Sequence, residues 1–98
     1  MTLKAIVELK AKPGRRNELL ALVETMYAAA GTPPGFIGTS RHASLQDPDT
    51  IIEINTWQSP EQFEAFIGSM DPEAMSPLME LLAEPFRRTL AGDFSGQS

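Results

Sequence analysis

Three side chains at alternate positions of one predicted strand are the residues best suited to chemistry. Glu53, Asn55 and Trp57 share one face of that strand, because successive strand residues point to opposite sides. Glu53 lies among isoleucines; since burial disfavours the charged form of a carboxyl group, it is a candidate general base. Asn55 could hold a carbonyl or phenolate oxygen. Trp57 could stack on a polycyclic ligand while its N–H donates a hydrogen bond.

The structural interpretation of each candidate stays open at this point. The shared face lines a pocket if it meets helices, and it forms an interface if it meets a partner sheet. Glu53 could instead form an interface ion pair with Arg87 or Arg88. Asn55 could be a structural strand residue, and Trp57 a core or interface residue.

His42, the only histidine, is the remaining catalytic candidate. The imidazole of an unperturbed histidine has a pKa near 6.5, which suits proton abstraction at neutral pH. The alternative is a structural histidine held by hydrogen bonds.

Several other chemistries lack the residues they need. The chain has no cysteine, which excludes disulfides, thiolate zinc sites and cysteine nucleophiles. There is no HExxH or GxSxG motif, and Gly35-Phe36-Ile37-Gly38 lacks the third glycine of a dinucleotide fingerprint. We interpret Asp47, Asp49 and Asp71 as turn and cap residues. We therefore expect no metal ion and no cofactor.

The elements that must position these residues follow from hydrophobic periodicity. The predicted order is β-α-β-β-α-β, with strands at 3–11, 36–45, 51–57 and 86–94, and helices at 19–30 and from 60 onward, broken at 71–72 and 76–77. This is a ferredoxin-like α+β fold in which helices cover one face of a four-stranded antiparallel sheet. Ser59 caps the second helix, Pro60 occupies its first position, and Gln62 completes a capping box.

Aromatic residues of the two helices fall on their apolar stripes. Tyr27 lies on the stripe of the first helix, and Phe63 and Phe66 lie on that of the second. We interpret all three as core residues that would also wall an apolar pocket and contact a substrate.

The third strand is apolar on both faces. Ile52 and Ile54 point one way, and Ile51 and Trp57 point the other. Such a strand is usually covered on both sides, and the helices of one small domain cover only one. A second copy of the chain is the simplest cover for the other face, so we expect a homodimer.

Composition limits the partners and the compartment. A formal net charge of -5 over 98 residues argues against a nucleic-acid module. No apolar stretch approaches the roughly 20 residues that span a bilayer. Lys4 and Glu8 interrupt the apolar residues where a signal peptide would lie, so we expect a cytoplasmic protein without membrane contact. One domain is expected at 1–94 and a loose tail at 95–98.

Four segments, in this order and spacing, resemble the antibiotic biosynthesis monooxygenase (ABM) family. They are Lys12-Pro13-Gly14 followed by Glu18-Leu19-Leu20, then Pro34-Gly35-Phe36-Ile37-Gly38, Ser44-Leu45-Gln46-Asp47-Pro48-Asp49, and Thr56-Trp57-Gln58-Ser59-Pro60-Glu61-Gln62-Phe63. The resemblance implies a dimeric α+β barrel with a pocket between helices and sheet in each subunit. Some relatives oxidise polycyclic phenols to quinones with molecular oxygen and no cofactor, others oxidise small quinols, and some degrade haem.

The residues of the phenol-oxidising relatives carry over only in part. Their tryptophan at the end of the third strand matches Trp57. Their asparagine four positions earlier is Glu53 here, and their tyrosine six positions later is Phe63. Near the place of their helical arginine, this chain has Pro77 and Leu78. The asparagine and histidine of the haem-degrading branch have no counterpart.

The resemblance implies a cofactor-independent monooxygenase acting on a small or polycyclic phenol or quinol with molecular oxygen. Trp57 would stack on the substrate, and Asn55, Glu53 or His42 would bind or deprotonate its hydroxyl group. One alternative is a non-redox module that binds or isomerises a small molecule on the same fold. Another is an interaction domain whose dimer is itself the functional object.

Overall fold

Burial alternates along the central strands and shows which side of the sheet the helices cover. The computed structural model describes residues 2–93. Within them the elements in chain order are β1 (Leu3–Lys10), α1 (Arg16–Ala30), β2 (Phe36–Ala43), β3 (Thr50–Trp57), α2 (Pro60–Ser69), the 3₁₀ helix η1 (Pro72–Met75), α3 (Ser76–Leu81) and β4 (Arg87–Gly92). This confirms the predicted β-α-β-β-α-β order. The second helical segment is divided near the two prolines that predicted breaks.

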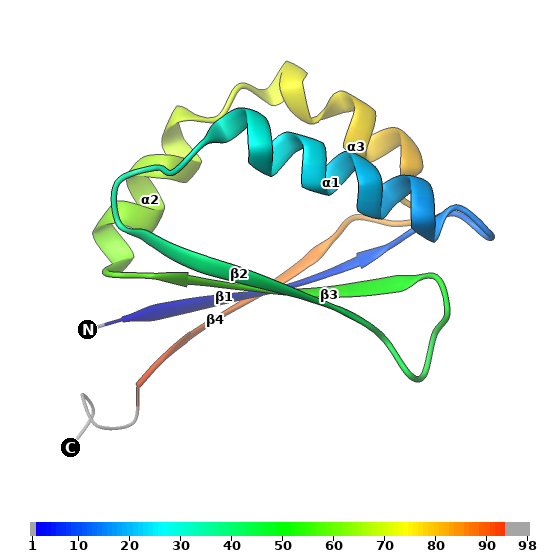
Figure 1. The fold of residues 1–98 in the computed structure, drawn as a ribbon, viewed down its shortest axis with the longest axis horizontal. Helices are drawn as coiled ribbons and strands as arrows, with labels where there is room; N and C mark the ends of the chain where they lie inside the picture. The colour runs from blue at the N-terminus through cyan, green and yellow to red at the C-terminus, as the bar shows by residue number, and fades with distance from the viewer. Residues whose placement is uncertain (1, 94–98) are drawn as a thin grey trace.

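The strands form one antiparallel sheet in the order β2-β3-β1-β4. All the helices lie on one side of it (Figure 1). This is the predicted α+β ferredoxin-like arrangement. None of the helices in the described part of the chain is long and apolar enough to cross a membrane.

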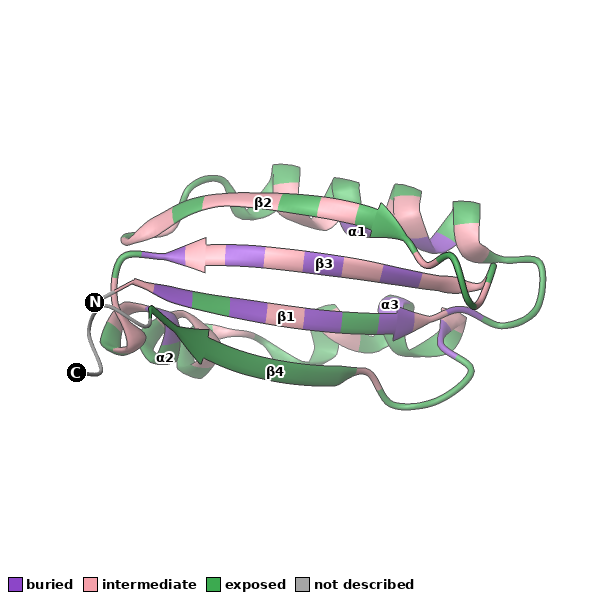
Figure 2. Cartoon of the chain, turned by 90° about the horizontal axis from the view of Figure 1, so that it is seen from below, coloured by how far each residue is buried: buried purple, intermediate pink, exposed green. Residues whose placement is uncertain are grey.

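The helix-covered face of β3 carries the candidate residues. Ile51, Glu53, Asn55 and Trp57 are buried, whereas the positions between them are only half-buried. The paired residues of β1 alternate in the same way. Seen from the open side of the sheet, no helix stands before the strands (Figure 2). The shared face of Glu53, Asn55 and Trp57 therefore meets the helices of its own chain.

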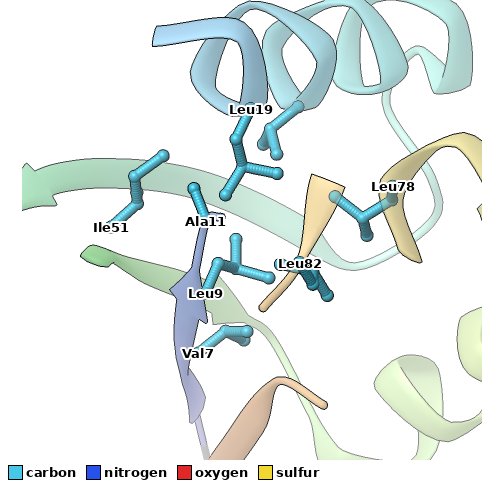
Figure 3. Packing of buried hydrophobic residues seen from close by; sticks show 8 residues of the cluster. Val7, Leu9, Ala11, Leu19, Ile51, Leu78 and Leu82 are labelled. Atoms are coloured by element: carbon cyan, nitrogen blue, oxygen red, sulfur yellow. The ribbon is translucent and has the colours of Figure 1, made fainter. Parts of the chain in front are cut away.

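Two groups of buried apolar side chains hold the helices on the sheet. One surrounds Leu19, which is fully buried, and Figure 3 shows it; it consists of Val7, Leu9, Ala11, Leu19, Val23, Ile51, Leu78 and Leu82. The other surrounds Trp57 and consists of Leu3, Ala5, Trp57 and Phe63. Truncating a leucine in such a core typically lowers the free energy of unfolding by about 2–5 kcal/mol, so these groups contribute strongly to holding the helices on the sheet.

The start of α2 matches the prediction for Ser59 and Pro60, whereas the Gln62 side chain accepts a hydrogen bond from the Ser59 hydroxyl at 3.1 Å and not from the Ser59 backbone N–H of a capping box. The Ser59 hydroxyl accepts a hydrogen bond from the Gln62 backbone N–H at 3.3 Å, and Pro60 begins the helix. The Gln62 side chain lies against Gly35, whose φ is +87°. A Cβ at position 35 would overlap that side chain, so glycine there lets the chain enter β2 close to α2.

Several predicted element ends are wrong by a few residues. β2 ends at Ala43 because the Ser44 hydroxyl accepts hydrogen bonds from the backbone N–H groups of Gln46 and Asp47, which turns the chain. β1 ends at Lys10, and Ala11 forms only an isolated bridge. β4 begins at Arg87 and ends at Gly92. The predicted strand residue Phe94 and the predicted tail 95–98 lie outside the described residues.

Candidate functional site

A cavity of about 420 Å³ lies between the helices and the sheet. Its lining includes residues of β1 and β3 on the sheet side and of α1 and α2 on the helix side, and most of these residues are apolar. Cavities that bind small molecules commonly measure about 300–1,000 Å³ and combine an apolar wall with a few polar groups. The cavity is thus of the size and character that suits an aromatic molecule.

Aromatic rings surround Trp57 on this wall. The centre of the Trp57 ring lies 5.3 Å from that of Phe36, 5.7 Å from that of Phe63 and 5.1 Å from that of Phe66. All four residues line the cavity. The prediction that Phe63 and Phe66 wall a pocket agrees with this placement. Phe36 adds a ring that the sequence reasoning did not single out, although it starts a predicted strand.

The indole N–H of Trp57 is enclosed, although the residue itself lines the cavity. Trp57 is only 3% exposed, and within residues 2–93 its N–H has no hydrogen-bond acceptor. A buried donor left unpaired costs about 1–3 kcal/mol.

Glu53 is the centre of a buried polar cluster in the same cavity. Its Oε1 accepts hydrogen bonds from the Tyr27 hydroxyl at 2.5 Å and from Asn55 Nδ2 at 3.1 Å. Its Oε2 accepts from Arg41 Nε at 2.9 Å, and the side chain of Glu53 is 5% exposed. Tyr27, Asn55 and Glu53 all line the cavity, so the polar cluster forms part of its wall.

Tyr27 acts as a neutral donor in this cluster. Burial raises the pKa of the Tyr27 hydroxyl, and the charge and hydrogen bond of Glu53 raise it further, while Asn55 and Arg41 lower it by less. The Tyr27 oxygen also lies 2.9 Å from Asn55 Oδ1, but its single hydrogen serves one acceptor at a time. Tyr27 was interpreted as a core residue lining a pocket; its hydroxyl in addition orients Glu53.

Arg41 is the residue of this cluster that sequence reasoning missed. Its guanidinium lies 4.4 Å from the centre of the Tyr27 ring and pairs with Glu53 across the β2–β3 hairpin, where the two residues are register partners. Within the chain, Glu53 therefore pairs with Arg41 and not with Arg87 or Arg88, which lie on β4 beside β1. The sequence predicted that the second and third strands pair as a hairpin, but it did not predict the register that places Arg41 opposite Glu53.

The sequence of the chain matches the model of the antibiotic biosynthesis monooxygenase family over residues 2–77. The chain belongs to this family. No curated protein matches it in sequence.

Solved structures share the fold of this family member at low sequence identity. A conserved protein from Methanosarcina mazei is 16% identical with a TM-score of 0.79, covering 93% of this chain and 91% of that one. SnoaB, a cofactor-independent oxygenase from Streptomyces nogalater, is 14% identical with a TM-score of 0.78, covering 95% and 93%. A Mycobacterium tuberculosis protein is 18% identical with a TM-score of 0.78, covering 96% of each chain. At such identities the likeness shows the fold alone.

His42 does not join the site of this ABM family member. It pairs with Ile52 on the open side of the sheet, and its Nε2 lies 3.1 Å from Ser40 Oγ in an exposed setting. Its neighbour Arg41 points to the helix side, since side chains alternate along a strand. The structure of the chain thus does not bring His42 together with Glu53, Asn55 and Trp57.

Proposed function

We propose that this protein is a monooxygenase that oxidises a phenol or quinol with molecular oxygen, without a metal or flavin. One observation carries the proposal: the buried side chain of Glu53 lines the same cavity as the aromatic residues Trp57 and Phe66. Membership of the ABM family supports the same reaction class.

Each group of the cavity has a role in this proposal. The substrate ring lies against Trp57 and Phe66, and its hydroxyl group donates to the carboxylate of Glu53, which takes the proton. Tyr27 and Arg41 hold the two carboxylate oxygens in place through the hydrogen bonds at 2.5 and 2.9 Å. A base held in position commonly contributes about 10²–10⁴-fold to a rate.

The deprotonated substrate supplies the electrons in the proposed reaction. For a phenol with a hydrogen at the opposite ring carbon, phenol plus O₂ gives quinone plus water. The ring loses the hydroxyl and carbon-bound hydrogens and gains one oxygen atom, and the second oxygen atom leaves as water. The apolar wall excludes bulk water, which limits side reactions of the intermediates.

Oxygen uptake with a panel of naphthols, hydroxyanthracenes and quinols tests the proposal. We expect uptake with at least one phenol, and we expect Glu53→Gln to slow it about 10²–10⁴-fold. Glu24→Gln is the matched control, because Glu24 is exposed on α1 and does not line the cavity; its rate should stay within about twofold. Absence of uptake across the panel, from protein shown to be folded, would refute the monooxygenase.

A non-redox role is the second candidate, and the hydrogen bonding of Glu53 favours it. A carboxylate that is fixed by three partners in an apolar cavity also suits moving a proton between two carbons of a bound molecule. Tight binding of a ligand that is recovered unchanged or isomerised, with no oxygen consumed, would support this role in place of oxidation.

The proposed active form is a homodimer that covers the open side of the sheet. Ile6, Ile52 and Ile54 lie on that side and are only half-buried in the single chain. Apolar side chains gathered on an uncovered sheet favour burial against a partner. A second copy would bury them without changing the helix side.

A further inference from the structure

One row of side chains runs across the helix face of the sheet and links all the strands. Arg41 on β2 pairs with Glu53 on β3, Glu53 with Val7 on β1, and Val7 with Arg88 on β4. Neighbouring strands are about 4.8 Å apart, so the backbone positions of Glu53 and Arg88 are about 10 Å apart. Only the apolar Val7 stands between the carboxylate and the guanidinium of this row.

Arg88 lies at the wall of the same cavity. Its guanidinium carbon lies 5.5 Å from the centre of the Phe63 ring and 5.4 Å from that of Phe86. Both rings line the cavity together with Arg88. Contact of a cation with two rings holds this exposed side chain against the aromatic wall of the cavity.

The charge of Arg88 is not balanced by the acidic groups of the cavity. In the part of the chain that the structure describes, no carboxylate lies within 4 Å of its guanidinium. Glu53 is paired with Arg41. Asp71, the other acidic residue of the lining, accepts the backbone N–H of Glu73 as the cap of η1.

We propose that the pocket selects a hydroxylated aromatic acid, with the hydroxyl group at Glu53 and the carboxylate at Arg88. This rests on the proposed function in taking the cavity as the substrate site, and it adds the substrate class. The guanidinium fork matches a planar carboxylate with two parallel hydrogen bonds. A fused-ring system over Val7 places the two groups at opposite ends of the row. Arg88 is thus a residue that determines specificity, and Glu53 remains the base.

Titration calorimetry without oxygen tests this selection, because no turnover then complicates binding. The probes are naphthol, naphthoic acid and a hydroxynaphthoic acid with its two substituents at opposite ends of the rings. We expect the hydroxy acid to bind about 10- to 100-fold more tightly than naphthol, as a hydrogen-bonded charge pair allows. Arg88→Gln should abolish this difference while leaving naphthol affinity within about twofold, and Arg88→Lys should retain part of it.

Arg87→Gln is the matched control. It removes the same charge from the next position of β4, but Arg87 pairs with Glu8, whose side chain lies on the open side of the sheet. The preference for the acid should survive this change. An equal loss of the preference for the acid in Arg87→Gln and Arg88→Gln would overturn the inference, because the preference would then depend on overall charge.

The outcomes for binding and for oxidation are separable. Binding of the hydroxy acid that depends on Arg88, without oxygen uptake in air, would uphold the inference and refute the monooxygenase. Oxygen uptake with naphthol, together with hydroxy acid binding that is no tighter than naphthol binding, would uphold the monooxygenase and refute the inference.

Discussion

Tyr27 is the only tyrosine of the chain, so its ionisation can be followed by itself. Burial of its hydroxyl and the negative charge of Glu53 both raise the pKa of Tyr27 and so favour the neutral form. At this scale the site consists of the carboxylate of Glu53, two neutral donors to its Oε1, Tyr27 and Asn55, and Arg41, which donates to its Oε2.

We predict that the tyrosinate absorbance of the folded protein rises well above the pH of a free tyrosine, whose pKa is about 10. Because the pKa of Tyr27 is raised on folding, its contribution to stability is complete below about pH 10 and is lost as the pH rises beyond it. A pH titration in native buffer and in denaturant measures both midpoints. Glu53→Gln should lower the native midpoint; coincident midpoints in native and denatured protein would contradict the cluster.

Trp57→Ala should be strongly destabilising, because the indole is 3% exposed and contacts three aromatic rings. We expect the free energy of unfolding to fall by about 3–5 kcal/mol in urea denaturation. Leu45→Ala is the control: Leu45 is fully exposed, and its change should stay within about 0.5 kcal/mol. A loss at Trp57 no larger than this would show that the ring is not part of the core.

At the scale of the elements, the positions of the cavity walls depend on where α2 begins. Ser59 caps this helix, and Phe63 and Phe66 then reach the cavity from its first turns. Strand β3 supplies the opposite wall by simple alternation. Removal of the cap would therefore destabilise the wall that α2 contributes, while the polar cluster around Glu53 would keep its residues.

Ser59→Ala should lower the free energy of unfolding by about 1 kcal/mol, the usual value of an N-cap hydroxyl. Ser69 lies at the exposed far end of the same helix, and its hydroxyl donates only to the Phe66 carbonyl. Ser69→Ala should therefore change the free energy of unfolding by less than about 0.5 kcal/mol. Urea denaturation of both variants makes the comparison. Similar losses at both positions would argue against the cap.

At the scale of the whole molecule, the open side of the sheet is a surface that no helix of the described residues covers. One side of the sheet carries all the helices, and Figure 2 shows the other, open side. Ile6 on β1 and Ile52 and Ile54 on β3 are half-buried there. A single domain of this size has no further element in residues 2–93 to cover them.

We predict that the protein runs at twice its chain mass in light scattering at micromolar concentration. Ile54→Lys places a charge on the open side and should give a monomer, since an unpaired buried charge is costly. Met79→Lys adds the same charge on the exposed side of α3 and should leave the dimer intact. A monomeric parent protein would refute the dimer.

Local geometry is what the sequence by itself determined. The period of two placed Glu53, Asn55 and Trp57 on one face, and Ser59-Pro60 marked the start of α2, because both depend only on neighbouring residues. The element order followed in the same way from periodicity and from glycine and proline breaks. Element ends were less accurate, since side-chain hydrogen bonds such as those of Ser44 decide them.

Contacts between distant residues were decided only by the tertiary structure. The pairing of Arg41 with Glu53 depends on the register of a hairpin, and a slip by one residue would have turned His42 to the helix side instead. The bond from Tyr27 to Glu53 joins residues 26 positions apart and requires α1 to lie over β3. Packing of helices on a sheet sets such distances, and no local pattern in the chain encodes them.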